Sequence, residues 1–254
     1  MAPWEQDFDF YLAELDGAPA SFLVDLALRD HAPLASHPRL LTVRIPMLAP
    51  REDGLRHSDE LAALGTIEDR SVERFCGEHD AIYIGHLVHG GVTTLFHYLP
   101  AGRGRDASEL LAAVGPLPEG YAATASVDDD PDWKQARAMA PDTLAEQTIW
   151  NRRLLRILAD GGDALEVARE VDHMAYFPTR SAADRAADDL RASGFRVDDA
   201  RESDDEGEWT LAFHRDDVLA DGRPDEFVAE IFAILDRHHG RYDGWGAEQR
   251  ARDV

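Results

Sequence analysis

The sequence has little of several residue types that usually mark a site or a compartment. It contains one cysteine, Cys76, and one lysine, Lys134, and every other basic residue except histidine is an arginine. A single cysteine excludes an intrachain disulfide and is typical of a reducing compartment. No apolar run approaches roughly 18 residues, so no membrane-spanning helix is predicted. The N-terminal residues also lack the basic start and apolar stretch of a signal peptide. We therefore expect a cytoplasmic protein.

The chain also has a large deficit of positive charge. Its net charge is -24 over 254 residues, while apolar residues make up 44 %, a share typical of globular proteins. Self-repulsion of this size favours solubility and disfavours nucleic acids and anionic membranes as partners. We expect a protein partner with a basic surface and no direct nucleic acid or membrane contact.

The common catalytic and ligand-binding motifs are absent as well. There is no Gly-rich phosphate loop, dinucleotide fingerprint, G-x-S-x-G elbow or H-E-x-x-H pair. No catalytic residue, cofactor site or metal site is therefore predicted. Cys76 falls near the end of a predicted helix, where the dipole disfavours a thiolate, and we expect it to be unreactive. An unrecognised enzyme site around His86, His89 and His97 stays open as a less favoured hypothesis.

Residues 1–140 have the pattern of an α+β domain. Strands are predicted at 19–29 and 38–48, and a helix over 58–76 starts at Ser58 as N-cap. Two apolar runs that flank Gly90 and Gly91 predict a hairpin, and this turn places Tyr83 opposite Tyr98, His86 opposite Leu95 and His97 opposite Ile84. A helix at 106–115 and a strand at 120–127 complete the order ββαββαβ, and 128–133 is predicted to be a loop.

Residues 141–254 predict a second α+β domain. An amphipathic helix over 142–162 ends at a Gly-Gly pair. The order βαββαβ follows, with helices at 181–194 and 224–240. One compact solution is an antiparallel sheet with both helices on one face, a ferredoxin-like sandwich. The fold class is thus α+β, with two sandwich domains.

A dense acidic run, "DDARESDDEGE", covers the end of the predicted strand "FRVDDARES", the turn "DDEG" and the start of the predicted strand "GEWTLAFHRD" in the second domain. Either it is a solvated hairpin tip or it is a docking surface for a basic peptide, because such charges steer association and are weakened by salt. The candidate partner-binding residues are Asp198, Asp199, Glu202, Asp204, Asp205, Glu206 and Glu208.

The second domain resembles the RraB family, bacterial regulators of ribonuclease E activity. The resemblance covers about 147–248 and rests on "NRRLLRILADGGD" (151–163), "VDHMAYF" (171–177), "WTLAFHR" (209–215) and "GRYDGWG" (240–246). Its motif residues are His173, Tyr176, Phe177, Tyr242, Asp243, Gly244 and Trp245, and Tyr242 to Trp245 is the most specific part. Gly244 allows a turn, and the two aromatic residues can close the sandwich.

The first domain resembles a domain of unknown function, number 695 in that series, through Trp4, Tyr11, "PASFLVDLAL", "YIGHLVHGG" and "DPDW". The resemblance of the second domain implies a non-catalytic regulator that binds ribonuclease E and lowers its activity. An acidic interaction or immunity-type protein that neutralises a different basic partner is the alternative, because fold does not decide function.

Overall fold

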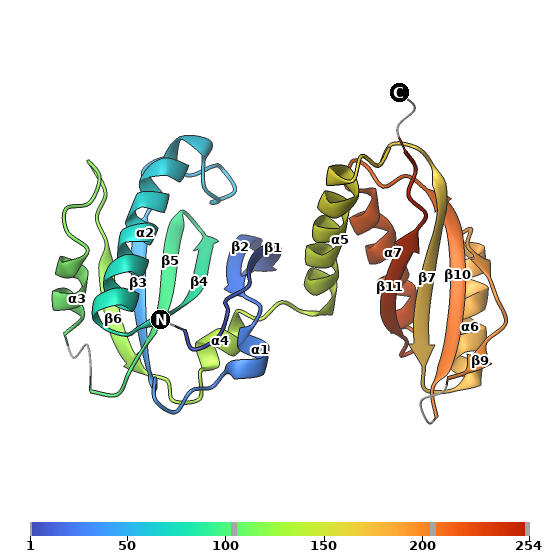
Figure 1. The fold of residues 1–254 in the computed structure, drawn as a ribbon, viewed down its shortest axis with the longest axis horizontal. Coiled ribbons are helices and arrows are strands. Elements are labelled where there is room, and N and C mark those ends of the chain that lie inside the picture. Colours follow the sequence, from blue (N-terminus) through green and yellow to red (C-terminus); the bar gives the residue numbers. More distant parts are fainter. Residues whose placement is uncertain (1, 103–105, 204–206, 252–254) are drawn as a thin grey trace. The chain divides into compact units, whose positions relative to one another are not determined.

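A computed structural model describes residues 2–102, 106–203 and 207–251. Its contacts divide the chain into two compact units, residues 1–141 and 142–254. Each unit combines helices with one antiparallel sheet (Figure 1), which confirms the predicted α+β class. Within these ranges, no helix has both the length and the apolar character needed to cross a membrane.

The N-terminal unit is built on a six-stranded antiparallel sheet with the order β1-β2-β4-β5-β3-β6. Its strands are β1 (Phe8–Leu15), β2 (Ala18–Asp25), β3 (Arg39–Pro46), β4 (Ile82–His89), β5 (Val92–Leu99) and β6 (Thr124–Asp129). Its helices are α1 (Leu28–His31), the 3₁₀ helix η1 (Ser58–Glu60), α2 (Leu61–Glu78), α3 (Ala107–Ala113) and α4 (Lys134–Ala138). Buried side chains of α2 and α3 pack with those of β3, β4 and β5 into one apolar core.

Every helix and strand predicted for this unit is present, although residues 128 and 129, predicted as loop, belong to β6, and His57 instead of Ser58 is the N-cap of η1. The sequence pattern did not reveal β1. That strand lies at the edge of the sheet, and Tyr11 is its only buried residue. A strand with one buried side chain lacks the apolar alternation by which strands are recognised. The short helices α1 and α4 were also missed, because four and five residues are too few to show a helical period.

The register of the β4–β5 hairpin was predicted only in part. His86 lies opposite Leu95, as expected, but Tyr83 lies opposite His97, so the predicted pairs Tyr83–Tyr98 and Ile84–His97 are wrong. A β-bulge between Tyr83 and Gly85 shifts the register by one residue.

Glycine is required at the bulge of this hairpin. Gly85 has φ +129°, and a Cβ there would lie 1.9 Å from the carbonyl oxygen of Leu23 on β2. The bulge turns Tyr83 and His86, which are three residues apart, toward the same side of the sheet, where both contact Glu68 of α2.

The C-terminal unit has the predicted βαββαβ order, preceded by a long helix. The helices are α5 (Thr143–Asp160), α6 (Arg180–Ala192) and α7 (Arg223–Asp236). The strands are β7 (Arg169–Phe177), the two short pieces β8 (Arg196–Val197) and β9 (Arg201–Glu202), β10 (Trp209–Asp217) and β11 (Arg241–Ala247). Strand order is β11-β7-β10-β8, with β9 also paired to β10, and β11, β7 and β10 lie side by side in Figure 1.

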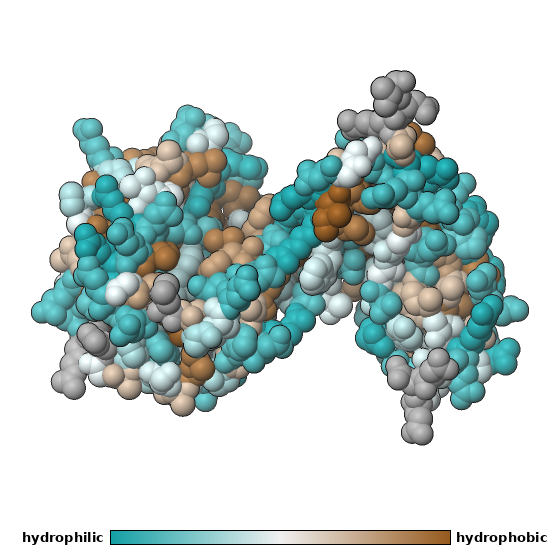
Figure 2. All heavy atoms as spheres, in the orientation of Figure 1, coloured by the Kyte–Doolittle hydropathy of each residue, from teal (hydrophilic) through white to brown (hydrophobic). Residues whose placement is uncertain are grey.

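Helices close one face of this sheet. Alternate residues of β7, including Val171, Ala175 and Phe177, pack into a core with the alanine-rich side of α6 and the apolar side of α7. Helix α5 packs mainly against α7 and leaves Ile157 65 % exposed, and hydrophobic residues reach the surface at this helix in Figure 2. The other residues of β7, including Asp172, Met174 and Tyr176, lie outside this core and form the open face of the sheet.

Candidate functional site: the open face of the C-terminal sheet

The segment Tyr242-Asp243-Gly244-Trp245 contains a β-bulge. Tyr242 pairs with Ala175 and Gly244 pairs with Met174, so the register shifts between them, and Gly244 has φ +145°. Residues three apart on a regular strand point to opposite faces. Because of the bulge, Tyr242 and Trp245 both reach the helix side, while Asp243 is exposed.

His173 and Tyr242 form a buried polar pair inside the helix side. Nδ1 of His173 lies 2.7 Å from the hydroxyl of Tyr242, and the imidazole packs among the rings of Phe195, Phe213 and Phe227. Burial, assisted by the charge of Arg215, lowers the pKa of His173 to about 3. A histidine held neutral in an aromatic core is a structural group at neutral pH, not a proton donor to solvent.

Trp245 links β11 to two helices. Its Nε1–H donates to Oδ1 of Asn151 on α5 at 2.7 Å, and its ring meets Phe227 edge to face at 5.7 Å. Phe177 is fully buried, whereas Tyr176 lies on the other side of β7 under the guanidinium of Arg241. The seven motif residues therefore divide: His173, Phe177, Tyr242 and Trp245 build the core, while Tyr176, Asp243 and Gly244 belong to the open face.

The open face is hollowed where the bulge meets the neighbouring strands. Small or flexible residues lie on the strands across this hollow: Met174, Ala212, Gly244 and Gly246. Its volume is about 510 Å³. Three exposed carboxylates, Asp172, Asp198 and Asp243, also line it. We call this set the acidic hollow.

None of these three carboxylates makes an ion pair or a side-chain hydrogen bond with any residue that the structure describes. The nearby cations are already engaged: Arg196 lies 2.8 Å from Glu170 and 3.0 Å from Asp216. Arg241 pairs with Glu208 at 3.1 Å. The acidic hollow thus presents uncompensated negative charge, which suits a guanidinium or ammonium group from another molecule.

The acidic run predicted to bind a partner is only partly at this site. Asp198 lines the hollow, Asp199 is exposed in the loop that follows it, and Glu202 lies on β9 opposite Trp209. Glu208 forms an ion pair with Arg241. Asp204, Asp205 and Glu206 lie outside the described residues.

The sequence analysis did not single out Asp172, which lines the hollow, and it treated Asp243 only as part of a motif. Both are far in sequence from Asp198, and only the strand order β11-β7-β10-β8 brings the three together. A signal was present, because Asp172 alternates with Val171 and His173 and so had to face away from the core.

The histidine hypothesis for the first unit leads to a second polar cluster. The carboxylate of Glu68 accepts a hydrogen bond from the Tyr83 hydroxyl at 2.6 Å and lies 2.8 Å from Nδ1 of His86. Arg56 lies 3.4 Å from the same carboxylate. Burial raises the pKa of Glu68, but the hydrogen bonds and the charges of His86 and Arg56 together lower it to about 2.

The three histidines named for that hypothesis do not converge on one point. His97 is completely buried, and neither of its ring nitrogens has a hydrogen-bond partner within the described part of the chain. His89 instead contacts the carbonyl of Pro19 at the other end of β4. Among the described residues, no three histidine, cysteine or acidic side chains are grouped as a metal site. Burial also raises the pKa of the Cys76 thiol, which disfavours the reactive thiolate.

Fold and site together define a class: a two-domain α+β protein whose C-terminal sheet has an acidic open face. Comparison with known proteins identifies the family of each unit. Residues 148–247 match the family model "Regulator of ribonuclease activity B", and residues 6–136 match "Family of unknown function (DUF695)". The chain belongs to the RraB family through its C-terminal unit and to this family of unknown function through its N-terminal unit, as the resemblances predicted.

A curated relative supports this membership. The regulator of ribonuclease activity B of Idiomarina loihiensis is 36 % identical over 107 residues, which are 41 % of this chain and 79 % of the relative. A crystal structure of an unknown protein from Galdieria sulphuraria covers 84 % of this chain and 99 % of its own. It has 9 % identity and a TM-score of 0.21, which is too low for a comparison of folds.

Proposed function

We propose that this protein is a non-catalytic regulator that binds a ribonuclease of the ribonuclease E type and changes its activity. The acidic hollow would receive a basic segment of the nuclease. Membership of the RraB family supports the regulatory role. The single observation that supports the binding mode is the set of three exposed carboxylates, Asp172, Asp198 and Asp243, that have no cation partner among the residues described.

The geometry of the hollow suits an arginine side chain. A guanidinium forms paired hydrogen bonds with carboxylates, and its flat face can approach a floor that lacks large side chains. Gly244, Gly246 and Ala212 supply such a floor between the acidic residues. Basic, partly disordered segments bind in this way and order on binding. The regulator would then act by occupying that segment, without chemistry of its own.

The test neutralises the hollow and leaves the fold intact. A triple variant, Asp172→Asn, Asp198→Asn and Asp243→Asn, removes three charges from exposed positions. The control variant Asp160→Asn, Asp184→Asn and Asp188→Asn makes the same change of charge on helices α5 and α6. Titration calorimetry measures binding to ribonuclease E of the same organism at several salt concentrations, with an RNA-cleavage assay beside it.

We expect the hollow variant to bind at least about tenfold more weakly, with a smaller salt dependence, and to lose its effect on cleavage. The control should behave like the parent protein. Equal affinity and equal salt dependence for both variants would contradict the proposed binding mode. A pull-down from cell extract at low and high salt then identifies the partner. Recovery of a different basic protein without ribonuclease E would favour the interaction or immunity-type alternative.

A further inference from the structure

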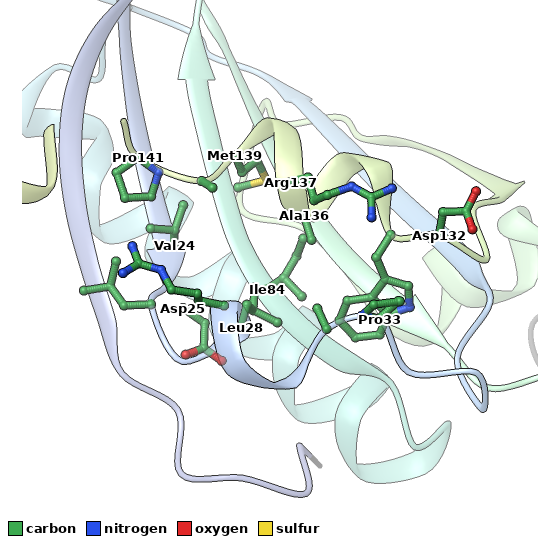
Figure 3. Close-up of a pocket in the computed structure, with 15 residues that line it drawn as sticks. Val24, Asp25, Leu28, Pro33, Ile84, Asp132, Ala136, Arg137, Met139 and Pro141 are labelled. Carbon is green, nitrogen blue, oxygen red and sulfur yellow. The ribbon is translucent and has the colours of Figure 1, made fainter. Parts of the chain in front are cut away.

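The N-terminal unit contains a pocket that is separate from the polar cluster around Glu68. It has a volume of about 280 Å³ and lies between β2, β4, α1 and α4. Its inner wall is apolar and includes Val24, Ile84, Trp133, Ala136 and Met139, all nearly or fully buried. Figure 3 shows that side chains from these separate parts of the chain surround it. A dry cavity of about 150 Å³ already binds benzene, so this pocket can hold an apolar group about twice as large.

The residues that characterise the N-terminal unit gather at this pocket. The segment "PASFLVDLAL" supplies Val24 and Leu28, "YIGH" supplies Ile84, and "DPDW" supplies Asp132 and Trp133. Segments distant in sequence therefore share one cavity. Exposed residues at its rim, among them Asp132 and Arg137, leave the pocket open to solvent, so a ligand can enter it.

Trp133, which forms one wall of the pocket, has a strained backbone conformation that several contacts hold in place. Trp133 has φ +54°, a left-handed conformation that is rare for a large residue. Its ring stacks on Tyr98 at 3.9 Å, and its Nε1–H donates to the carbonyl of His37 at 2.8 Å. Asp130 fixes the same segment by accepting hydrogen bonds from Tyr98 and from the first amides of α4. Strain maintained by surrounding contacts is typical of ligand sites.

A second fixed element is Asp25 at the pocket edge. Its carboxylate accepts four hydrogen bonds, from the side chains of Trp4 and Gln6 and from the backbone amides of Asp7 and Ala27. These donors occupy the carboxylate, so Asp25 holds the N-terminal segment against β2 and is not available to pair with a ligand cation.

The outer part of the pocket carries two guanidinium groups, Arg29 and Arg137, and one exposed carboxylate, Asp132. Arginine binds carboxylates through paired, charge-assisted hydrogen bonds. From the apolar interior and this rim we infer that the pocket binds a small organic acid, with an apolar body inside and a single carboxylate at Arg137. The N-terminal unit would then be a ligand-binding domain, independent of the function proposed for the acidic hollow.

The test uses the full chain labelled with ¹⁵N and octanoate as the probe. We expect octanoate to shift the amide signals of Val24, Ile84 and Ala136 and the indole signal of Trp133, with a Kd of about 0.1–1 mM, which is ordinary for ten non-hydrogen atoms. Octanamide, which has the same size without the charge, should bind at least about fivefold more weakly. Octylamine should not bind.

Two variants locate the site. Arg137→Gln removes a charge from an exposed position and should weaken octanoate binding about five- to tenfold, while Arg44→Gln, an exposed arginine of β3, should leave it unchanged. Ala136→Leu fills the pocket and should abolish binding. Equal binding of octanoate and octanamide, or tighter binding of octylamine, would overturn the carboxylate assignment. Absence of any shift at these residues up to 10 mM octanoate, a concentration about tenfold above the weakest expected Kd, would overturn the site itself.

Discussion

The neutral, buried His173 makes the C-terminal unit sensitive to acid. Its pKa is lowered to about 3 in the folded protein by burial and the charge of Arg215, against 6.5 for an unperturbed histidine. Below pH 6.5 His173 is protonated in the unfolded chain but stays neutral in the folded chain until the pH approaches 3. The associated stability is therefore fully present above pH 6.5 and is lost progressively as the pH falls toward 3.

The size of this loss follows from the two pKa values. Each pH unit between them corresponds to about 1.4 kcal/mol, so acidification from pH 7.5 to pH 5 should cost the C-terminal unit about 2 kcal/mol from His173 alone. Stabilities of single domains are roughly 5–15 kcal/mol, so the change is a substantial fraction of the total. A difference between variants isolates the contribution of His173.

The double variant His173→Phe and Tyr242→Phe removes the titrating ring together with its hydrogen-bond partner, so no buried polar group is left unpaired. Tyr242→Phe alone keeps the titrating ring and serves as the control. Hydrogen exchange of β7 and α7 peptides in the full chain, corrected for the intrinsic pH dependence, measures the free energy of opening at pH 7.5 and pH 5.

The double variant should lose about 2 kcal/mol less than the control between these two pH values. The two variants would then differ mainly at acid pH. If both variants lost the same stability, His173 would have to be protonated without penalty in the folded unit. The description of this histidine as a neutral core residue would then be wrong.

Substitutions at three further positions test the packing and the electrostatics of the two units. Gly85→Ala should unfold the N-terminal unit, because its Cβ would lie 1.9 Å from the carbonyl oxygen of Leu23; amide NMR spectra should show this unit lost and the C-terminal unit retained. Trp245→Ala should destabilise the C-terminal unit by roughly 3–5 kcal/mol, whereas Trp245→Phe, which loses the 2.7 Å bond to Asn151, should cost about 1 kcal/mol by urea unfolding. The pKa of Glu68 is lowered from 4.5 to about 2, so the stability that this carboxylate contributes is present above pH 4.5 and is lost as the pH falls toward 2. Between pH 5.5 and pH 3 the Glu68→Gln variant should therefore lose roughly 2 kcal/mol less stability than the parent protein. An equal loss in both proteins would refute the assignment.

The sequence was sufficient where burial alternates clearly along the chain. Strands β7 and β10 and helices α6 and α7 have strong apolar periods, so their order, and the family to which they belong, could be predicted. Strand β1 could not be predicted, because it is a strand through its pairing with β2 and its own side chains show no clear apolar alternation. The acidic hollow was also hidden, because its three carboxylates come from β7, the loop after β8, and β11. Their proximity depends on the order of the strands in the sheet, and local sequence patterns do not determine that order.

Each unit contains a β-bulge of similar sequence, and the bulge in β4 explains the wrongly predicted register of the hairpin. Tyr83-Ile84-Gly85-His86 and Tyr242-Asp243-Gly244-Trp245 share the order tyrosine, any residue, glycine, ring. In each case the glycine adopts a positive φ and the register shifts, so both ring residues reach the helix side. An isolated glycine in a strand is a known sign of a bulge. Had that sign been used, the hairpin register would have been predicted correctly.

The two bulges differ in the residue that lies on the face of the sheet opposite the helices. At β11 the extra residue is Asp243, which is exposed and lines the acidic hollow, while Tyr242 and Trp245 bind inward to His173 and Asn151. At β4 it is Ile84, which lines the apolar pocket, while Tyr83 and His86 bind inward to Glu68. In each strand the bulge thus lets two ring side chains contact the helices, while the residue that follows the tyrosine lies on the opposite face of the sheet. Asp243 and Ile84 each follow a tyrosine that points toward the helices, so each faces the opposite side of its sheet and lines one of the two proposed binding sites.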